Sequence, residues 1–567
     1  MNMALTNAKI YTCNEAAPWA DTVVIKDGII SYVGTGGMEK WKTSAGITEE
    51  GEISVYDMKG KMIIPGIIDS HIHPGMVSQS SWHIRLPWTE DVNELLAFVK
   101  EYAETHPVSE APFLYFEYYP TSMFGERGPR KELLDTAVSD RPCLCQDFGE
   151  HQHWVNSKML ELMGVTKDTP DPVPGLEMFV RDENGEPNGW LKEFVHMRFA
   201  DTLYENIGWT PPVTMTPELM EGFFRFMTEH GITAIADGLL EGEAQLASMA
   251  ELDRQGKLNV YYDGILRFWS YDDLPDKIAE LRKYQEKYTN RHMKINTLKL
   301  FLDGTNESGN SALLSPHLND PSGTYFGEIK MDTEELKKCL LLLNREGLDI
   351  HIHMVGDRAF RVGCDAVEAA QEEAARLGEP WKMQVIFAHC ELIDPADMPR
   401  PAKLGITINW SCHWSGGYFG EEAQTYICKD KWEKMYQFNP IIESGALVTF
   451  SSDVVTYYEL HRADPFFSMQ VAHTRVDPEF PLDPDIYPGS VRPEESARLS
   501  REVLMKGYTI SGARQLRWED RMGSVEVGKI ANLDVISENF FEASPDKISE
   551  IRFDAVIFDG QVIFGEL

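Results

Sequence analysis

Two histidines lie two residues apart at the end of an apolar run, in the segment Asp69-Ser70-His71-Ile72-His73. Residues i and i+2 of a β-strand project to the same side, so we expect the two imidazoles to converge. Neutral imidazole is a good ligand for Zn²⁺ and other borderline transition metals, and packing explains such a pair poorly. The alternative is a solvated turn that is rich in histidine.

Lys299 is a second unusual residue. It lies in the run at residues 298–304, where its neighbours up to residue 302 are all apolar. An unpaired ammonium is costly in such a strand, so the lysine must be neutralised or used. One solution is a lowered pKa and reaction with CO₂ to a carbamate, an anionic oxygen ligand that can bridge two metal ions. The alternative is a lysine that pairs with a buried carboxylate, and the residues alone favour neither.

Further polar side chains follow strand-like runs later in the chain. His351 and His353 end one run, His389 ends the next, and Asp453 ends the last. A single histidine in such a place is more often a hydrogen-bonded part of the core. Several polar residues at corresponding strand ends, however, indicate one common site.

Such a site needs a scaffold that brings strand ends together. Apolar runs alternate with helical stretches along most of the chain, which is typical of a parallel sheet or barrel. We expect eight strands, at residues 61–71, 231–238, 259–268, 295–304, 348–353, 383–389, 405–410 and 446–453. The sequence therefore predicts an α/β fold, a TIM (β/α)8 barrel whose site lies at the C-terminal ends of its strands.

Both ends of the chain have short, alternating runs that are punctuated by turns. We expect them to pair into one composite β-sandwich domain, residues 1–63 and 520–567, beside the barrel, residues 64–519. The gap after the first barrel strand is far longer than an ordinary βα loop. Residues 75–215 are therefore expected to form a large inserted cap subdomain over the strand ends.

Composition narrows the classes of partner and compartment. The chain has 567 residues, 43% of them hydrophobic, and 53 basic against 90 acidic residues give a net charge of −37. That field repels phosphate backbones and anionic membrane surfaces, so we expect no nucleic acid and no membrane as partner. Eight cysteines without a dense framework, and no signal-peptide or membrane-span pattern, predict a cytoplasmic protein.

Together these motifs resemble the amidohydrolase superfamily, and within it the branch similar to N-substituted formamide deformylase. The resemblance covers nearly the whole chain. Each matching segment alone is weak evidence for the family, but their order and placement along the chain are specific. They are PGIIDSHIHPG (65–75), EHQHWVNSKML (150–160), GWLKE (189–193), GITAIADG (231–238), LKLFLDG (298–304), HIHMVGDRAF (351–360), FAHCELI (388–394), SSDVV (451–455) and GSVEVGKIANLDVI (523–536).

The resemblance implies a metal centre at the strand ends. Carried over position by position, it assigns metal ligation to His71, His73, Lys299, His353, His389 and Asp453. Lys299 matches the lysine that is carboxylated in two-metal members. Asp453 matches the catalytic aspartate, which accepts the proton of the attacking water. The implied cofactor is Zn²⁺, as one or two ions, or another divalent transition metal.

Three more residues are candidate substrate contacts. His151 matches a histidine of the family's inserted segment, and Glu193 matches the end of the GWLKE motif, although a solvated carboxylate is an equal alternative. His351 shares a strand face with His353, but the spacing before Gly-Asp selects His353 as the ligand. His153 is expected at the surface.

An aromatic segment, residues 410–420, follows the seventh predicted strand. Its rings are expected either to line an apolar substrate pocket or to pack beneath the cap. The sequence alone does not separate these two placements.

The implied activity is that of a metal-dependent amidohydrolase. It would hydrolyse a nonpeptide C–N bond, an N-formyl or N-acyl amide of a small organic molecule, with metal-activated water. Within the superfamily the alternatives are a cyclic amidase and a deaminase. Outside it, the barrel could bind a small molecule without catalysis, or the acidic surface could bind a partner. The resemblance also implies a homodimer.

Overall fold

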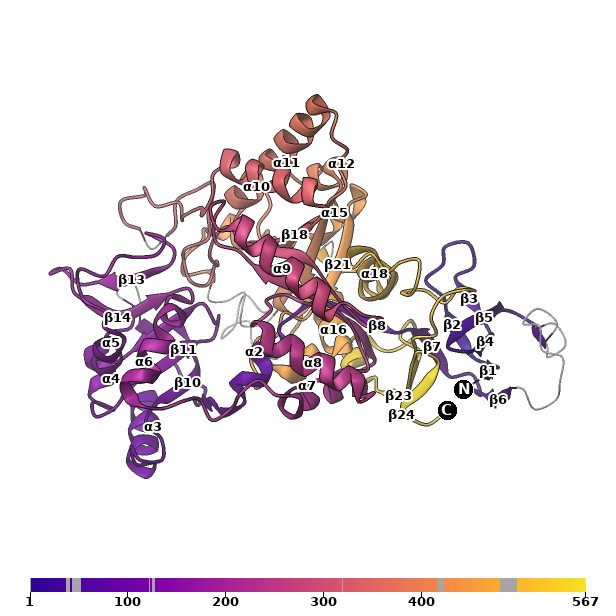
Figure 1. Cartoon of the computed structure of the whole chain (residues 1–567), viewed down its shortest axis with the longest axis horizontal. Coiled ribbons are helices and arrows are strands. Elements are labelled where there is room, and N and C mark those ends of the chain that lie inside the picture. The colour runs from indigo at the N-terminus through magenta and orange to yellow at the C-terminus, as the bar shows by residue number, and fades with distance from the viewer. Residues whose placement is uncertain are drawn as a thin grey trace.

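The structure is a computed structural model that describes residues 2–36, 41–42, 53–121, 123–124, 128–318, 320–416, 423–479 and 497–567. Its centre is an eight-stranded parallel sheet in the order β21-β20-β19-β18-β17-β16-β15-β8 (Figure 1). Helices lie between successive strands along the chain. The predicted α/β fold with a TIM barrel is confirmed.

The barrel strands are β8 (Ile67–Ile72), β15 (Ile232–Asp237), β16 (Tyr261–Arg267), β17 (Met293–Phe301), β18 (Asp349–Met354), β19 (Val385–His389), β20 (Ile406–Ser411) and β21 (Leu447–Ser451). Most of their residues are buried, which explains why the sequence shows them as nearly continuous apolar runs. The main helices around them are α7 (Pro217–Glu229), α8 (Glu243–Arg254), α9 (Leu274–Tyr288), α10 (Thr333–Glu346) and α11 (Asp357–Leu377). In the described ranges, no helix combines the length and apolarity that crossing a membrane requires.

Strands from both chain ends form two further sheets on one side of the barrel (Figure 1). Their orders are β24-β23-β22-β7-β2-β3 and β5-β4-β1-β6. The bounds are β1 (Met3–Thr6), β2 (Lys9–Tyr11), β3 (Trp19–Ala20), β4 (Thr22–Lys26), β5 (Ile29–Gly34), β6 (Ser54–Asp57), β7 (Met62–Pro65), β22 (Leu533–Ile536), β23 (Phe553–Phe558) and β24 (Gln561–Gly565). One hydrophobic cluster takes residues from both sheets, including Leu5, Val23, Ile63 and Val535. The two chain ends therefore pair, while the exact domain boundaries stay a prediction.

The predicted first barrel strand, residues 61–71, is wrong in one respect, because it consists of two strands in different sheets. β7 pairs with β2 and β22, and the chain enters the barrel as β8 only after Gly66. A Cβ atom at Gly66 would lie 2.4 Å from Thr233 Oγ1, so glycine allows the close approach to β15. The apolar residues on both sides of Gly66 concealed this change of sheet.

The long segment between β8 and β15 folds around a sheet of its own, on the opposite side of the barrel from the chain ends (Figure 1). Its strands are β9 (Ile84–Arg85), β10 (Leu114–Tyr119), β11 (Cys143–Asp147), β12 (Gln152–Val155), β13 (Met178–Arg181) and β14 (Pro187–Lys192). Helix α3 (Val92–Thr105) packs on one face, and α5 (Ser157–Met163) and α6 (Ala200–Ile207) pack on the other. We call this segment the insert; its limits at residues 75 and 215 and its role as a cap stay predictions.

The first and last barrel strands meet at a junction that we call the seam, residues 69–73 and 450–454. The backbone N–H of Asp453 donates to the carbonyl of His71 at 2.8 Å. Because this bond joins the C-terminal ends of β8 and β21, it places residues from both strands at one point of the barrel mouth.

Asp69 fixes the seam through its buried carboxylate. Oδ1 accepts hydrogen bonds from the backbone N–H groups of His71 and Ser452, both at 3.2 Å, and Oδ2 accepts one from Ser452 Oγ at 2.6 Å. Burial raises the pKa of the Asp69 carboxyl to about 7. A single side chain therefore ties the end of β8 to Ser452, the residue before Asp453.

Replacing Asp69 by alanine should destabilise the seam. The substitution leaves buried donors of Ser452 without an acceptor, which costs about 1–3 kcal/mol, and it should lower both the urea midpoint of unfolding and the metal content. Asp168→Ala, at an exposed aspartate of the insert, is the matched control and should change neither. An unchanged midpoint and metal content in Asp69→Ala would contradict the role of the seam.

Candidate metal centre

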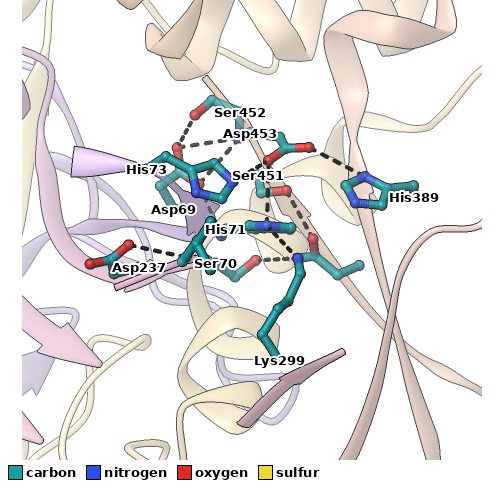
Figure 2. A network of polar contacts seen from close by, with 12 residues as sticks. Asp69, Ser70, His71, His73, Asp237, Lys299, His389, Ser451, Ser452 and Asp453 are labelled. Carbon is teal, nitrogen blue, oxygen red and sulfur yellow. Dashed lines mark hydrogen bonds and ion pairs between the residues drawn. The ribbon is translucent and has the colours of Figure 1, made fainter. Parts of the chain in front are cut away.

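Three histidines surround one carboxylate at the mouth of the barrel. Asp453 Oδ1 lies 3.0 Å from His73 Nε2 and 3.4 Å from His71 Nε2, and Asp453 Oδ2 lies 3.3 Å from His389 Nδ1 (Figure 2). His71, His389 and Asp453 each offer one atom, and these atoms all lie within 4.8 Å of one another. All four side chains are buried. Imidazole and carboxylate donors at this spacing suit a divalent transition metal.

Burial keeps the three imidazoles in the neutral form that binds metal. It holds the pKa of His73 below its usual value and the pKa values of His71 and His389 well below theirs. The Nδ1 atom of His389, which faces Asp453 Oδ2, is buried and has no hydrogen-bond partner among the described residues. Buried polar atoms of this kind are explained by a bound ion or an ordered water. The donor set therefore fits a metal ion.

Lys299 lies next to this group. Its Nζ atom is 3.1 Å from His71 Nε2 (Figure 2), and burial lowers the pKa of the ammonium to about 8. Across the described ranges, no carboxylate lies within 4.0 Å of Lys299 Nζ. The buried ion pair that the sequence left open is thus not seen.

His353 extends the group on the next side of the barrel. Its ring centroid lies 4.4 Å from that of His389, and its Nε2 lies 3.4 Å from the carbonyl of Gly304. His353 lines a cavity of about 40 Å³, which we call the metal cavity. The other predicted site residues in its wall are His71, His73, His151, Lys299, His389 and Asp453.

The insert supplies His151 to the metal cavity and Glu193 behind it. His151 Nδ1 lies 2.7 Å from Glu193 Oε2, and Asn310 Nδ2 donates to Glu193 Oε1 at 2.9 Å. Burial alone would lower the pKa of His151, but the charge and hydrogen bond of Glu193 raise it above its usual value. Glu193 is only 5% exposed, so it is not the solvated carboxylate that the sequence equally allowed.

Two other histidines lie outside the metal cavity. His351 is fully buried with its ring centroid 4.5 Å from that of His71, and it is absent from the described lining of the cavity. A substrate contact of His351 would therefore need a path past His71. His153, expected at the surface, is fully buried against His196, because β12 is an inner strand of the insert sheet. The surface placement of His153 was wrong.

Gly238 and Trp414 lie next to the histidines of the site. A Cβ atom at Gly238, just after β15, would lie 2.1 Å from His71 Cδ2 and 2.9 Å from His73 Cε1. Trp414 lies parallel to His389, with centroids 5.4 Å apart, and lines the metal cavity. It belongs to the predicted aromatic segment, whose residues 417–420 lie outside the described part of the chain. Gly238 was missed, although it directly follows an apolar run.

Backbone conformation also distinguishes the site. Glu150, Glu193, His389 and Asp453 have positive φ angles of 63°, 56°, 72° and 53°. This left-handed region is uncommon for residues other than glycine, and such strain tends to gather at functional sites. No sequence pattern reports it, because it depends on the surrounding fold that holds the backbone.

A parallel barrel with buried imidazole and carboxylate donors at its C-terminal mouth defines a metal-dependent hydrolase. Comparison with known families agrees with this class. The chain belongs to the amidohydrolase family, whose model matches residues 54–564. The protein is accordingly a metal-dependent hydrolase of C–N bonds other than peptide bonds, and the resemblance indicated by the order of its motifs is confirmed.

The similarity to individual relatives extends over most of the chain. It is 23% identical over 582 residues to N-substituted formamide deformylase of Arthrobacter pascens, with 99% of this chain and 97% of the relative covered. It is 29% identical over 454 residues to the exoenzymes regulatory protein AepA of Pectobacterium carotovorum subsp. carotovorum, covering 78% and 92%. A solved uncharacterized metal-dependent hydrolase from Pyrococcus horikoshii OT3, 20% identical, shares the fold with a TM-score of 0.67 over 96% of this chain and 99% of that chain.

Gly238→Ala should reduce metal binding without unfolding the barrel. The added methyl group would overlap the ring of His71 and push it out of line with Asp453. We expect metal affinity to fall by about tenfold or more, measured by equilibrium dialysis against Zn²⁺. Gly222→Ala in helix α7 is the matched control, because nothing lies within 4 Å of its Cβ position. Equal affinities of both variants would refute this packing argument.

Proposed function

We propose that the protein hydrolyses N-formyl or other short-chain N-acyl amides of small organic amines, with Zn²⁺ as the metal. The observation that carries the proposal is the group of buried, neutral imidazoles around Asp453 at the strand ends. His71, His73, His389 and Asp453 would hold the ion. Bound there, a divalent ion lowers the pKa of water and polarises the substrate carbonyl.

Asp453 is the proton carrier in the proposed reaction. Its carboxylate lies at the centre of the histidine group, where it can accept a proton from the attacking water and deliver it to the leaving nitrogen. His151 has a positioning role toward the substrate carbonyl. Glu193 binds its Nδ1 atom, which fixes the ring and leaves Nε2 for a hydrogen bond into the metal cavity.

The size of the metal cavity supports a small acyl group. Its volume is about 40 Å³, and one water needs roughly 10–15 Å³ on the same measure, so the cavity has room for a short acyl group beside the histidines but not for a bulky acyl chain. The rest of the substrate would extend into an adjoining cavity of about 420 Å³, which has Met76, Phe194 and Val455 as wall residues in common with the metal cavity. Similarity to a formamide deformylase along 99% of the chain supports the same substrate class.

We further propose that Lys299 is carboxylated and joins two ions. The deprotonated amine attacks the carbon of CO₂, an N–C bond forms, and one proton is released, which leaves an anionic carbamate. The position of Nζ beside His71, without a carboxylate partner in the described ranges, supports this role. In this two-ion form, which would replace the single-ion donor set, His71 and His73 would hold one ion, and His353 and His389 would hold the other.

Hydrolysis should depend on metal and on Asp453. With an N-formylated amine as substrate, the Zn²⁺-loaded protein should release formate and amine in equal amounts, and chelation should abolish the reaction until metal is restored. Asp453→Asn should lower kcat by about 10²–10⁴-fold because the proton acceptor is lost, whereas Asp168→Asn should not.

Product analysis separates the competing activities. Ammonia as the product would indicate a deaminase, and opening of a cyclic amide without release of an acid would indicate a cyclic amidase. Turnover that survives complete metal removal would contradict the proposed mechanism.

Carboxylation of Lys299 can be observed directly. Protein that is loaded with metal in ¹³C-labelled bicarbonate should show a carbamate carbon resonance. If the carbamate joins two ions, the protein should also contain about two ions per chain. Lys299→Ala should lose the resonance and part of the metal. Lys294→Ala, which removes another lysine of β17, should retain both. One ion and no carbamate signal in the unaltered protein would exclude the bridge.

A further inference from the structure

The cavity of about 420 Å³ beside the metal cavity is built mainly by the insert, and we call it the insert cavity. Tyr115 and Glu117 of β10 and Phe113, just before that strand, form part of its wall. The helical segment after β8, residues 74–82, and residues 455–456 after β21 also contribute. Its volume falls within the range of small-molecule sites. Because it has three wall residues in common with the metal cavity, a substrate held at the metal can reach it.

Aromatic rings give the insert cavity an apolar wall. The ring centroids of Trp82 and Phe113 lie 6.0 Å apart, and those of Phe113 and Tyr204 lie 6.4 Å apart. Phe194 lines both this cavity and the metal cavity. At these distances the wall rings pack against one another, so together they form an apolar surface on which an aromatic group can lie.

One buried carboxylate interrupts this apolar wall. Glu117 Oε1 lies 2.5 Å from His83 Nδ1, and the His83 ring stacks on Tyr115 with centroids 3.7 Å apart. Glu117 is only 3% exposed. Its Oε2 accepts no hydrogen bond from any residue in the described part of the chain. Oε2 is not among the described side-chain atoms that are both shielded from solvent and without a partner, so it is open to the cavity and can accept a hydrogen bond from a ligand there.

The charge of the insert cavity determines which donor fits. Three of its described wall residues are carboxylic acids, namely Glu117, Asp201 and Glu241, and none is a lysine or an arginine. His83 pairs with Glu117, while burial lowers the pKa of His196 to about 3 and keeps that ring uncharged. Glu117 is the buried one of these acids, while Asp201 is exposed and Glu241 is partly buried; with no lysine or arginine among the described wall residues, the wall favours a cation.

We infer that the insert cavity binds the amine-side substituent of the substrate, an aromatic group that bears a protonated nitrogen, and that Glu117 Oε2 accepts a hydrogen bond from this nitrogen. The orientation of the substrate rests on the proposed function, because it places the short acyl group in the metal cavity. His83 holds the carboxylate in place through Oε1 and thereby leaves Oε2 for the ligand.

Two N-formyl compounds of matched shape test this inference. N-[4-(aminomethyl)benzyl]formamide carries a cation at neutral pH, and N-(4-ethylbenzyl)formamide is its uncharged counterpart. Their dissociation constants are measured by isothermal titration calorimetry in the Zn²⁺-loaded Asp453→Asn background, where hydrolysis is slow, and kcat/KM is measured with Asp453 in place. We expect the cation to bind about tenfold or more tightly than the neutral compound, as a hydrogen bond between charged groups provides.

Glu117→Gln should remove this preference and leave the affinity for the neutral compound within about twofold of its original value, which also reports an intact cavity. Glu205→Gln, at an exposed glutamate of α6 that is not part of the cavity wall, is the matched control and should keep the preference. If Glu117→Gln does not fold, Glu117→Asp keeps the charge but withdraws it from the cavity, and it should reduce the preference.

Equal binding of the two compounds, no binding of either, or a preference that persists in Glu117→Gln would overturn the inference. Binding of the cation that depends on Glu117, without hydrolysis of either compound, would support the inference and contradict the proposed function. Hydrolysis of the neutral compound alone would support the proposed function and contradict the inference about the insert cavity. The two claims can thus fail separately.

Discussion

The meeting of the first and last barrel strands is the constraint on which the site depends. His73 and Asp453 are 380 residues apart in the chain, yet their side chains lie 3.0 Å apart because the seam joins the ends of β8 and β21. Asp69 binds the backbone on both sides of this junction. Closure also buries the histidines, which lowers their pKa values and keeps them neutral. One structural event therefore sets both the geometry and the protonation of the donor group.

The barrel and the insert supply different residues to the site. The barrel strands hold the metal donors on rigid elements, while the insert adds His151 and Glu193 close to them and Glu117 further into its own cavity. The insert can therefore vary without disturbing the donors on the barrel, since loops and insertions tolerate change better than barrel strands. His389 has a positive φ angle of 72°, an uncommon conformation that the surrounding structure must maintain.

The sequence predicted those features that depend on local pattern. Buried parallel strands appear as apolar runs, so all eight barrel strands were located, and the spacing of His71 and His73 indicated their shared direction. Features that arise when residues far apart in the sequence come close in space could not be predicted from the sequence. Gly66 and Gly238 matter because Thr233 and His71 come close to them in space. Likewise, nothing around Glu117 in the chain reveals that the fold buries it beside His83.

The most direct test of the account is anomalous diffraction at the zinc edge from crystals of the Zn²⁺-loaded protein. The account predicts a strong peak enclosed by His71, His389 and Asp453, since these are the donors that converge in the described structure. A second, neighbouring peak beside Lys299 and His353 would indicate the two-ion form. An active, zinc-containing protein with no peak at this position would contradict the assignment of the metal centre.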